Sequence, residues 1–200
     1  MRSENYDTIM EDILRARTES RLLLHCCCAP CASAAAERLL QAEILPTLFF
    51  YNPNITDPAE YDRRAEALKK LAALYRLPAV FRPFDPAAFE AAAKGREAQP
   101  EGGSRCEACF LLRLGGAAEY AAQNGYGLFA TTLTVSPHKN AAQINRIGLS
   151  LSGRYPGTAY LPTDFKKRDG YLRSIRLSGE LSLYRQDYCG CGFSKRERAL

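Results

Sequence analysis

Short apolar segments alternate along the chain with longer segments in which apolar positions recur at the spacing of a helix. The apolar segments have the length and composition of buried strands; they cover residues 21–25, 44–51, 78–82, 128–134 and 160–162. The amphipathic segments predict helices over residues 5–20, 32–41, 59–75, 86–93, 106–124, 138–149 and 170–183, the last interrupted at Gly179. Strands that alternate with helices predict an α/β fold, a Rossmann-like parallel sheet flanked by helices.

Loops with polar or thiol side chains follow three of the predicted strands. Residues 26–31 follow the first strand, residues 52–58 follow the second, and Ser136 follows the fourth. The carboxyl ends of parallel strands meet at one edge of a sheet, where binding sites gather. We therefore expect a metal site at the C-terminal ends of the strands.

The length of 200 residues suits one α/β domain, and no shift in composition marks a boundary. Within it, we expect residues 164–194 to close over the metal site. No apolar run approaches the roughly 20 residues of a membrane helix, and the N-terminal stretch lacks the apolar core of a secretory signal. These features predict a cytoplasmic protein without a membrane partner. The net charge of +5 is too small to indicate a nucleic-acid partner by itself.

Eight cysteines form three clusters. Four lie in residues 26–31, two are Cys106 and Cys109, and two are Cys189 and Cys191. A cytoplasmic compartment reduces disulfides, so such clusters indicate metal binding or redox chemistry. A closed zinc site needs four ligands, half of those present, and an iron–sulfur cluster fits the donor set better.

Two of the cysteine clusters carry further chemistry. A helix that begins near Cys106 and Cys109 would stabilise their thiolates through its N-terminal amides. Cys189 and Cys191 are spaced too closely for a relaxed disulfide, so a bond between them would be easily reduced. The alternative for this pair is ligation of a second metal. Cys26 is interpreted as a packing residue.

Several motifs in order along the chain carry a family resemblance. They are His25-x-Cys27-Cys28-Ala29-Pro30-Cys31, Tyr51-Asn52-Pro53-Asn54-Ile55 with Glu60-Tyr61, Gly102-Gly103-x-Arg105-Cys106-x-x-Cys109, Thr131-Thr132-Leu133 with Ser136-Pro137-x-Lys139, Asp164-Phe165-Lys166-Lys167 with Gly170-Tyr171, and Tyr184-Arg185-Gln186-Asp187-Tyr188-Cys189-Gly190-Cys191. With these motifs the chain resembles epoxyqueuosine reductases of the QueH type. The ordered set runs from residue 22 to residue 194 and is far more specific than one CxxC pair.

The resemblance implies an iron–sulfur oxidoreductase that converts epoxyqueuosine to queuosine at the wobble position of tRNA. It implies a [4Fe-4S] cluster held by Cys27, Cys28, Cys106 and Cys109, and a redox-active pair at Cys189 and Cys191. It also implies an adjacent mononuclear iron, for which Cys31 is a candidate ligand. The partners are then tRNA bearing epoxyqueuosine and an external electron donor.

Basic and aromatic residues in the matching segments are candidates for tRNA contact. They are Arg105, Lys139, Lys166, Lys167, Tyr171 and Arg185. Positive side chains would bind phosphates, and an aromatic ring would stack on an exposed base.

Two other functions compete with the reductase. A tRNA sulfurtransferase of the ATP-pyrophosphatase type needs a glycine-rich phosphate loop after the first strand, whereas residues 25–33 contain no glycine. A non-catalytic RNA-binding module stabilised by zinc would bind no iron. ATP binding separates the first from the reductase, and metal content separates the second.

Overall fold

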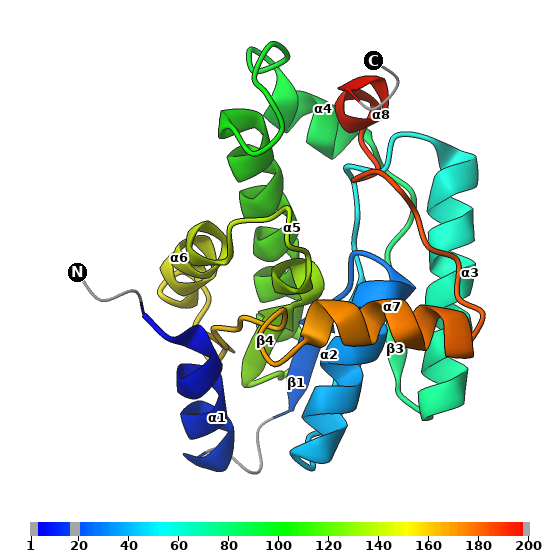
Figure 1. Ribbon diagram of the computed structural model, residues 1–200. Coiled ribbons are helices and arrows are strands. Elements are labelled where there is room, and N and C mark those ends of the chain that lie inside the picture. Colours follow the sequence, from blue (N-terminus) through cyan, green and yellow to red (C-terminus); the bar gives the residue numbers. More distant parts are fainter. Residues whose placement is uncertain (1–3, 17–20, 198–200) are drawn as a thin grey trace.

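The computed structural model describes residues 4–16 and 21–197. Its helices and strands follow in the order α1 (Tyr6–Ala16), β1 (Leu22–His25), α2 (Ala29–Gln41), β2 (Thr47–Phe50), α3 (Pro58–Tyr75), β3 (Ala79–Phe81), α4 (Ala87–Ala93), α5 (Ser104–Gln123), β4 (Leu128–Thr131), the 3₁₀ helix η1 (Thr132–Val135), α6 (Ala141–Ser152), β5 (Ala159–Tyr160), α7 (Gly170–Glu180) and α8 (Gly192–Glu197). In Figure 1 these elements can be followed by colour from the N-terminus to the C-terminus.

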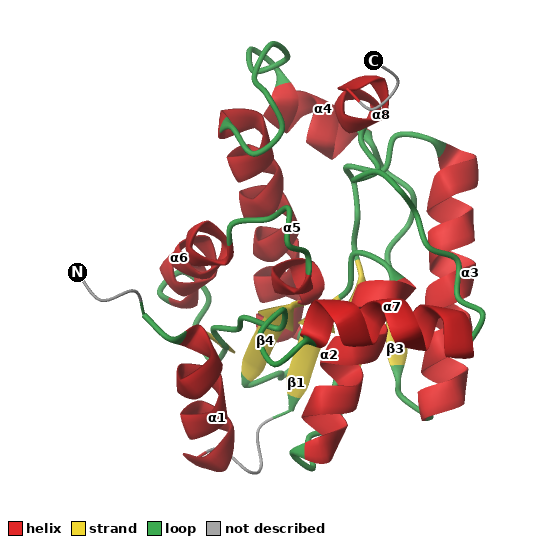
Figure 2. Cartoon of the chain, viewed as in Figure 1, coloured by secondary structure: helices red, strands yellow, loops and turns green. Residues whose placement is uncertain are grey.

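The five strands form one parallel sheet in the order β3-β2-β1-β4-β5. Helices lie on both sides of it, as Figure 2 shows. This confirms the predicted α/β class and the parallel, helix-flanked sheet. Among the described residues, no helix has both the length and the apolar character needed to cross a membrane.

Alternate side chains of the strands belong to two hydrophobic clusters. Leu22 and Leu24 of β1 pack in the cluster that includes α1, α2 and α3. Leu23 between them packs with side chains of α5 and α6. Because successive side chains of a strand point to opposite faces, each face of the sheet is covered by its own set of helices. The continuous apolar run of β1 is therefore buried on both faces.

The observed element boundaries differ from the predicted ones where local caps intervene. Helix α2 begins at Ala29 rather than at residue 32, because Pro30 fits the first turn of a helix. The strand predicted over 128–134 ends at Thr131, whose hydroxyl accepts a hydrogen bond from the Leu133 N–H and starts η1. The helix predicted over 138–149 begins at Ala141, because the Asn140 side chain caps it.

The ends of the chain show further differences. The first helix was predicted over residues 5–20, of which 17–20 lie outside the described residues.

The last predicted helix, over residues 170–183, also differs. Helix α7 continues through Gly179 and ends at Glu180, so the predicted interruption is wrong. Helix α8 was not predicted. In Figure 1 the chain leaves α7, passes along α3 and ends in α8 beside α4, beyond the sheet.

Candidate metal centre

The loops that follow β1, β2 and β4 are joined by hydrogen bonds at the carboxyl edge of the sheet. The backbone N–H of Cys27 donates to the Thr132 hydroxyl at 3.2 Å. The Asn52 side-chain amide donates to the Cys26 carbonyl oxygen at 2.9 Å. These contacts confirm that the three loops share one edge of the sheet, as the parallel topology predicts.

His25 fixes the start of the cysteine loop and is fully buried. Its Nε2 lies 3.1 Å from the Tyr51 carbonyl oxygen, so it carries the proton and donates. Its Nδ1 then accepts from the Thr131 hydroxyl at 2.8 Å. Burial, with help from the charge of Arg113, lowers the pKa of His25 to about 3. His25 is therefore a neutral structural link between three strands.

The sulfur atoms of Cys27, Cys28 and Cys31 all lie within 4.8 Å of one another. This group lies at the N-terminus of α2, because Cys28 is the N-cap residue of that helix and Cys31 belongs to its first turn. Hydrogen bonds from the two neighbouring thiols lower the pKa of Cys27 well below its ordinary value. Donation to Cys27 raises the pKa of Cys28 to about 11 and raises the pKa of Cys31 well above its ordinary value. The three sulfurs are therefore placed to bind one metal ion together.

A second group of cysteines lies beside the first. Cys106 and Cys109 belong to the first turns of α5, and the Gly102 N–H donates to the Cys106 sulfur at 3.2 Å. Cys109 packs with Cys191 and Phe89 in a small buried cluster. Burial raises the pKa of Cys109 to about 12 and also raises the pKa of Cys191. These thiols are therefore protonated at neutral pH until they bind a metal ion or are oxidised.

Two adjoining hollows bring the cysteine groups together. The larger, about 600 Å³, is lined by Cys27, Cys28, Cys31 and Cys189 among others. The smaller, about 320 Å³, is lined by Cys106, Cys109, Cys189 and Cys191 among others. They share Glu101, His138, Lys139 and Cys189. The tertiary structure therefore gathers seven of the eight cysteines at one end of the sheet.

Cys26 is the cysteine that lines neither hollow. Its side chain is fully buried, and its thiol donates to the Leu24 carbonyl oxygen at 3.2 Å. This confirms its interpretation as a packing residue.

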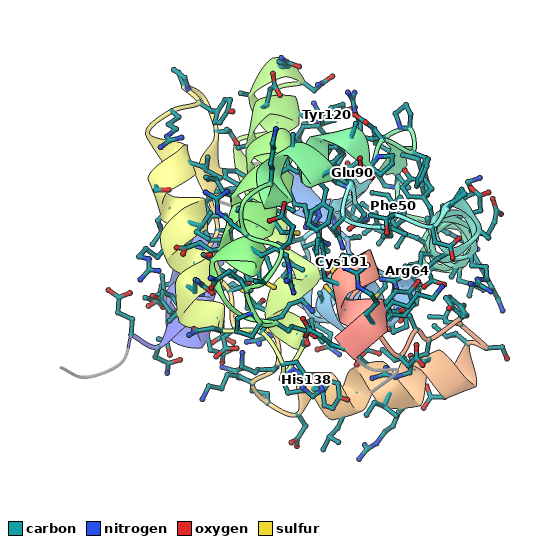
Figure 3. The ribbon with its side chains drawn as sticks, turned by 90° about the horizontal axis from the view of Figure 1, so that it is seen from above. Phe50, Arg64, Glu90, Tyr120, His138 and Cys191 are labelled. Atoms are coloured by element: carbon teal, nitrogen blue, oxygen red, sulfur yellow. The ribbon has the colours of Figure 1, made fainter. Side chains whose placement is uncertain are left out.

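Ser194, in α8, lies between the two cysteines of the C-terminal pair. Its hydroxyl accepts from the Cys189 N–H at 3.2 Å, and its own N–H donates to the Cys191 sulfur at 3.4 Å. Figure 3 looks down on this end of the molecule, with Cys191 and Arg64 near the centre of the view and His138 toward the edge. All eight cysteines are free thiols in the structure.

The candidate tRNA contacts fall into separate places. Lys139, Tyr171 and Arg185 line the larger hollow. The Arg185 guanidinium carbon lies 5.6 Å from the centre of the Tyr171 ring. Lys167 is exposed, and the Lys166 ammonium pairs with Asp164 at 3.1 Å, but neither lysine lines a cysteine hollow.

Arg105 differs from the expectation. Its side chain is only 2% exposed. Its guanidinium donates to the Glu97 and Gln99 carbonyl oxygens and to the Glu197 carboxylate. The Glu197 contact links α5 to α8, and the other two link α5 to the segment that precedes it, so Arg105 presents no free surface to a phosphate. We therefore exclude Arg105 from the tRNA contacts proposed below.

Lys139 lines both hollows. Burial works to lower the pKa of Lys139, but negative charge on Cys189, Cys27 and Cys31 outweighs it and raises the pKa overall. Lys139 is therefore positively charged at neutral pH. It places a positive charge where the two hollows meet.

Several buried polar residues of the site were not identified as functional from the sequence. Glu60 and Arg64 form an ion pair at 2.6 Å, and Arg113 donates to Asn52 at 2.6 Å. Asn52 and Glu60 stand in motifs that carry the family resemblance, which was the signal available for them. Arg64 and Arg113 lie in helical segments whose pattern resembles that of ordinary surface positions, so only the fold identifies them as buried.

The sequence profile of the family described as "Epoxyqueuosine reductase QueH" matches residues 22–197. The chain belongs to this family. The match covers every cysteine and all of the strands, so it includes the whole of the site.

Curated relatives from distant bacteria agree with this QueH assignment. Proteins named epoxyqueuosine reductase QueH are 36% identical in Streptococcus pyogenes over 207 aligned residues and 39% identical in Acinetobacter baylyi over 177. The alignments cover 98% and 88% of this chain, and 80% and 81% of the relatives. A relative in Thermotoga maritima is 37% identical, with 88% of this chain and 91% of the relative aligned.

Proposed function

We propose that this chain reduces epoxyqueuosine to queuosine at the wobble position of tRNA. The observation that carries the proposal is the match to the QueH family over residues 22–197. The gathering of seven cysteines beside two hollows supports it, because reduction of an epoxide requires electron-transfer groups at the substrate. The reaction consumes two electrons and two protons, forms the carbon–carbon double bond and releases the epoxide oxygen as water.

The donor set fits an iron–sulfur cluster. Thiolates are the ligands that such clusters take, and Cys27, Cys28, Cys106 and Cys109 lie on the two hollows that share Cys189. The buried Nε of Arg113 has no hydrogen-bond partner in the described part of the chain, so this site also holds positive charge available to an anionic group. We assign these four cysteines to a [4Fe-4S] cluster and Cys31 to an adjacent iron. The cluster would supply electrons and a Lewis acid for the departing oxygen.

Cys189 and Cys191 are assigned as the redox-active pair. Two thiols that join in a disulfide release two electrons and two protons, which balances the reduction of one epoxide. An external reductant then returns the disulfide to two thiols. Cys189 lines both hollows, which supports a role between the substrate and the metal groups.

We infer that tRNA binds over the larger hollow and the adjoining surface. Lys139, Lys166, Lys167 and Arg185 supply positive charge, and Tyr171 supplies a ring for stacking. Residues 164–194 are inferred to close over the metal site, since residues 185–189 line the larger hollow. A substrate of this kind places the reaction in the cytoplasm.

The test is anaerobic conversion of epoxyqueuosine in tRNA, measured by mass spectrometry of the nucleosides. The protein is loaded with iron and sulfide and supplied with a chemical reductant. We expect wild-type protein and the Cys26→Ser variant to form queuosine and the Cys106→Ser variant to form none. A fully loaded wild-type protein that forms no queuosine would refute the proposal. ATP binding would instead favour the sulfurtransferase, and zinc without iron would favour the RNA-binding module.

A further inference from the structure

Arg113 is buried between the two cysteine groups. Its side chain is among the largest in the fully buried core, with 1% exposure. It stands four residues after Cys109 in α5, so both lie on the same face of the helix. It also lines the larger hollow together with Cys27, Cys28 and Cys31. One guanidinium group therefore borders both sets of thiols.

The charge of Arg113 has no anionic partner in the described part of the chain. Three arginines there are buried. Arg64 pairs with Glu60 and Arg105 pairs with Glu197, whereas no carboxylate of residues 4–16 or 21–197 forms an ion pair with Arg113 within 4.0 Å. A buried charge without a counter-charge is strongly unfavourable. This placement thus points to an anion that the polypeptide itself does not provide.

Asn52 holds Arg113 in place without neutralising it. The side-chain Oδ1 of Asn52 accepts from the Arg113 Nη2 at 2.6 Å, and its side-chain Nδ2 donates to the Cys26 backbone carbonyl oxygen at 2.9 Å. The guanidinium is therefore tied to the loop that carries Cys27 and Cys28, while its Nε keeps no hydrogen-bond partner among the described residues. The neutral Asn52 amide therefore fixes the guanidinium beside the cysteines and does not cancel its positive charge.

We propose that Arg113 is the buried counter-charge of the iron–sulfur group and raises its reduction potential. This inference rests on the proposed function, because it needs an iron–sulfur occupant bound by thiolates. Such a group carries net negative charge that increases when it accepts an electron. A fixed positive charge in a region of low dielectric constant stabilises the more negative state, which makes reduction easier. Arg113 is therefore a positioning and tuning residue and needs no contact with the substrate.

The experiment compares wild-type protein with Arg113→Met and Arg113→Lys after anaerobic loading with iron and sulfide. Each is held at one fixed potential with dithionite and mediators, and the reduced cluster is measured by electron paramagnetic resonance. We expect at least a tenfold lower ratio of reduced to oxidised cluster in Arg113→Met, which is 59 mV for one electron. Arg113→Lys keeps the charge and should fall between the two.

A matched control removes a charge that water screens. Arg146 borders the smaller hollow, and its side chain is 71% exposed, so Arg146→Met should leave the ratio within twofold of wild type. An unchanged ratio in Arg113→Met, or an equal shift in Arg146→Met, would overturn the inference. If wild-type protein holds no iron and sulfide, the proposed function fails instead.

Thermal unfolding covers the case in which Arg113→Met does not retain its cluster. Without iron the buried charge of Arg113 has no counter-charge, so the iron-free variant should be at least as stable as the iron-free wild type. Loss of cluster with unchanged iron-free stability, restored in Arg113→Lys, supports the inference. A variant whose iron-free form unfolds at a clearly lower temperature shows that Arg113 serves the fold through Asn52, and overturns it.

Discussion

Arg64 donates a hydrogen bond from Nη1 to the Cys189 carbonyl oxygen at 3.1 Å. Its Nη2 donates to the neighbouring Tyr188 carbonyl oxygen, also at 3.1 Å. The Arg64 Nε is held at 2.6 Å by Glu60, whose other oxygen accepts from the Tyr184 hydroxyl at 2.8 Å. A buried ion pair on α3 thus positions the C-terminal segment that carries Cys189 and Cys191.

Replacing Arg64 should loosen this segment without removing any thiol. Arg64→Met leaves the buried Glu60 carboxylate without its main partner, which costs about 3 kcal/mol of unfolding free energy. Amide hydrogen exchange should rise over residues 184–191. Arg63 also pairs with Glu60 but is 58% exposed, so Arg63→Met should cost less than about 1 kcal/mol. Denaturant unfolding of both variants checks this, and equal losses would contradict it.

Gly190 allows the close turn between Cys189 and Cys191, the proposed redox-active pair. Its φ is +113°, and a Cβ there would lie 3.0 Å from the Ile55 side chain and 3.2 Å from the Arg64 guanidinium. Gly190→Ala should therefore cost at least about 2 kcal/mol and lower turnover, while iron content is retained. Gly157 has a φ of +85° with open space around it, so Gly157→Ala measures the backbone strain alone, about 1 kcal/mol. Gly190→Ala with full turnover would contradict the assigned role of this turn.

Single cysteine variants should separate metal ligands from packing residues. Cys27→Ser, Cys28→Ser, Cys106→Ser or Cys109→Ser should each lose cluster iron together with activity, because a hydroxyl is a poor ligand for this iron. Cys31→Ser should lose one iron and retain sulfide. Cys26→Ser should keep both. Iron and sulfide analysis after anaerobic loading gives the result, and full iron and sulfide in two of the first four variants would refute the ligand assignment.

The Cys191→Ser variant tests the redox-active pair against the alternative that it binds a metal. If Cys189 and Cys191 deliver electrons, the variant should keep all of its iron and fail to complete turnover with a thiol reductant. Mild oxidation of wild-type protein should consume two thiols and leave the iron in place. Loss of one iron from Cys191→Ser, with the cluster intact, would show instead that the pair binds a second metal.

His25 should make stability depend on pH in the acid range. Its pKa is about 3 in the folded protein and about 6.5 in the unfolded chain. Below pH 6.5 the unfolded state therefore binds a proton that the folded state does not, and stability falls as pH falls. From pH 7.5 to 5.5 the advantage of wild type over His25→Gln should shrink by about 1 kcal/mol. Denaturant titrations at both pH values measure it, and a constant difference would contradict the neutral, buried state of His25.

Binding of tRNA should weaken as salt increases, with a slope set by the number of phosphates that the protein neutralises. Removing Lys167 and Arg185 together should reduce the magnitude of that slope by about 0.7–0.9 for each phosphate that is no longer neutralised. Arg154 follows the C-terminal end of α6, on the side where the parallel strands begin and away from the cysteines, so Arg154→Ala should leave the slope unchanged. Filter binding at several salt concentrations distinguishes these outcomes. An unchanged slope in the double variant would place the tRNA elsewhere.

The sequence alone determined the fold class, the family and the three groups of cysteines. Apolar periodicity is a local property, so segments such as residues 22–24 predicted buried strands and the helices between them predicted parallel pairing. Cysteine types and spacing are also local, and they identified the three clusters. Element ends such as Ala29 and Asn140 were missed because capping depends on the geometry of one or two residues.

Only the tertiary structure decided which groups meet. Arg64 and Cys189 are joined across the chain, and Arg113 lies between cysteines from two separate segments. Arg105 was expected on the surface but is buried, because α8 packs beside it and supplies Glu197. The physical reason is that burial and charge pairing are properties of three-dimensional neighbours. In the sequence, a buried arginine of a helix cannot be distinguished from an exposed one.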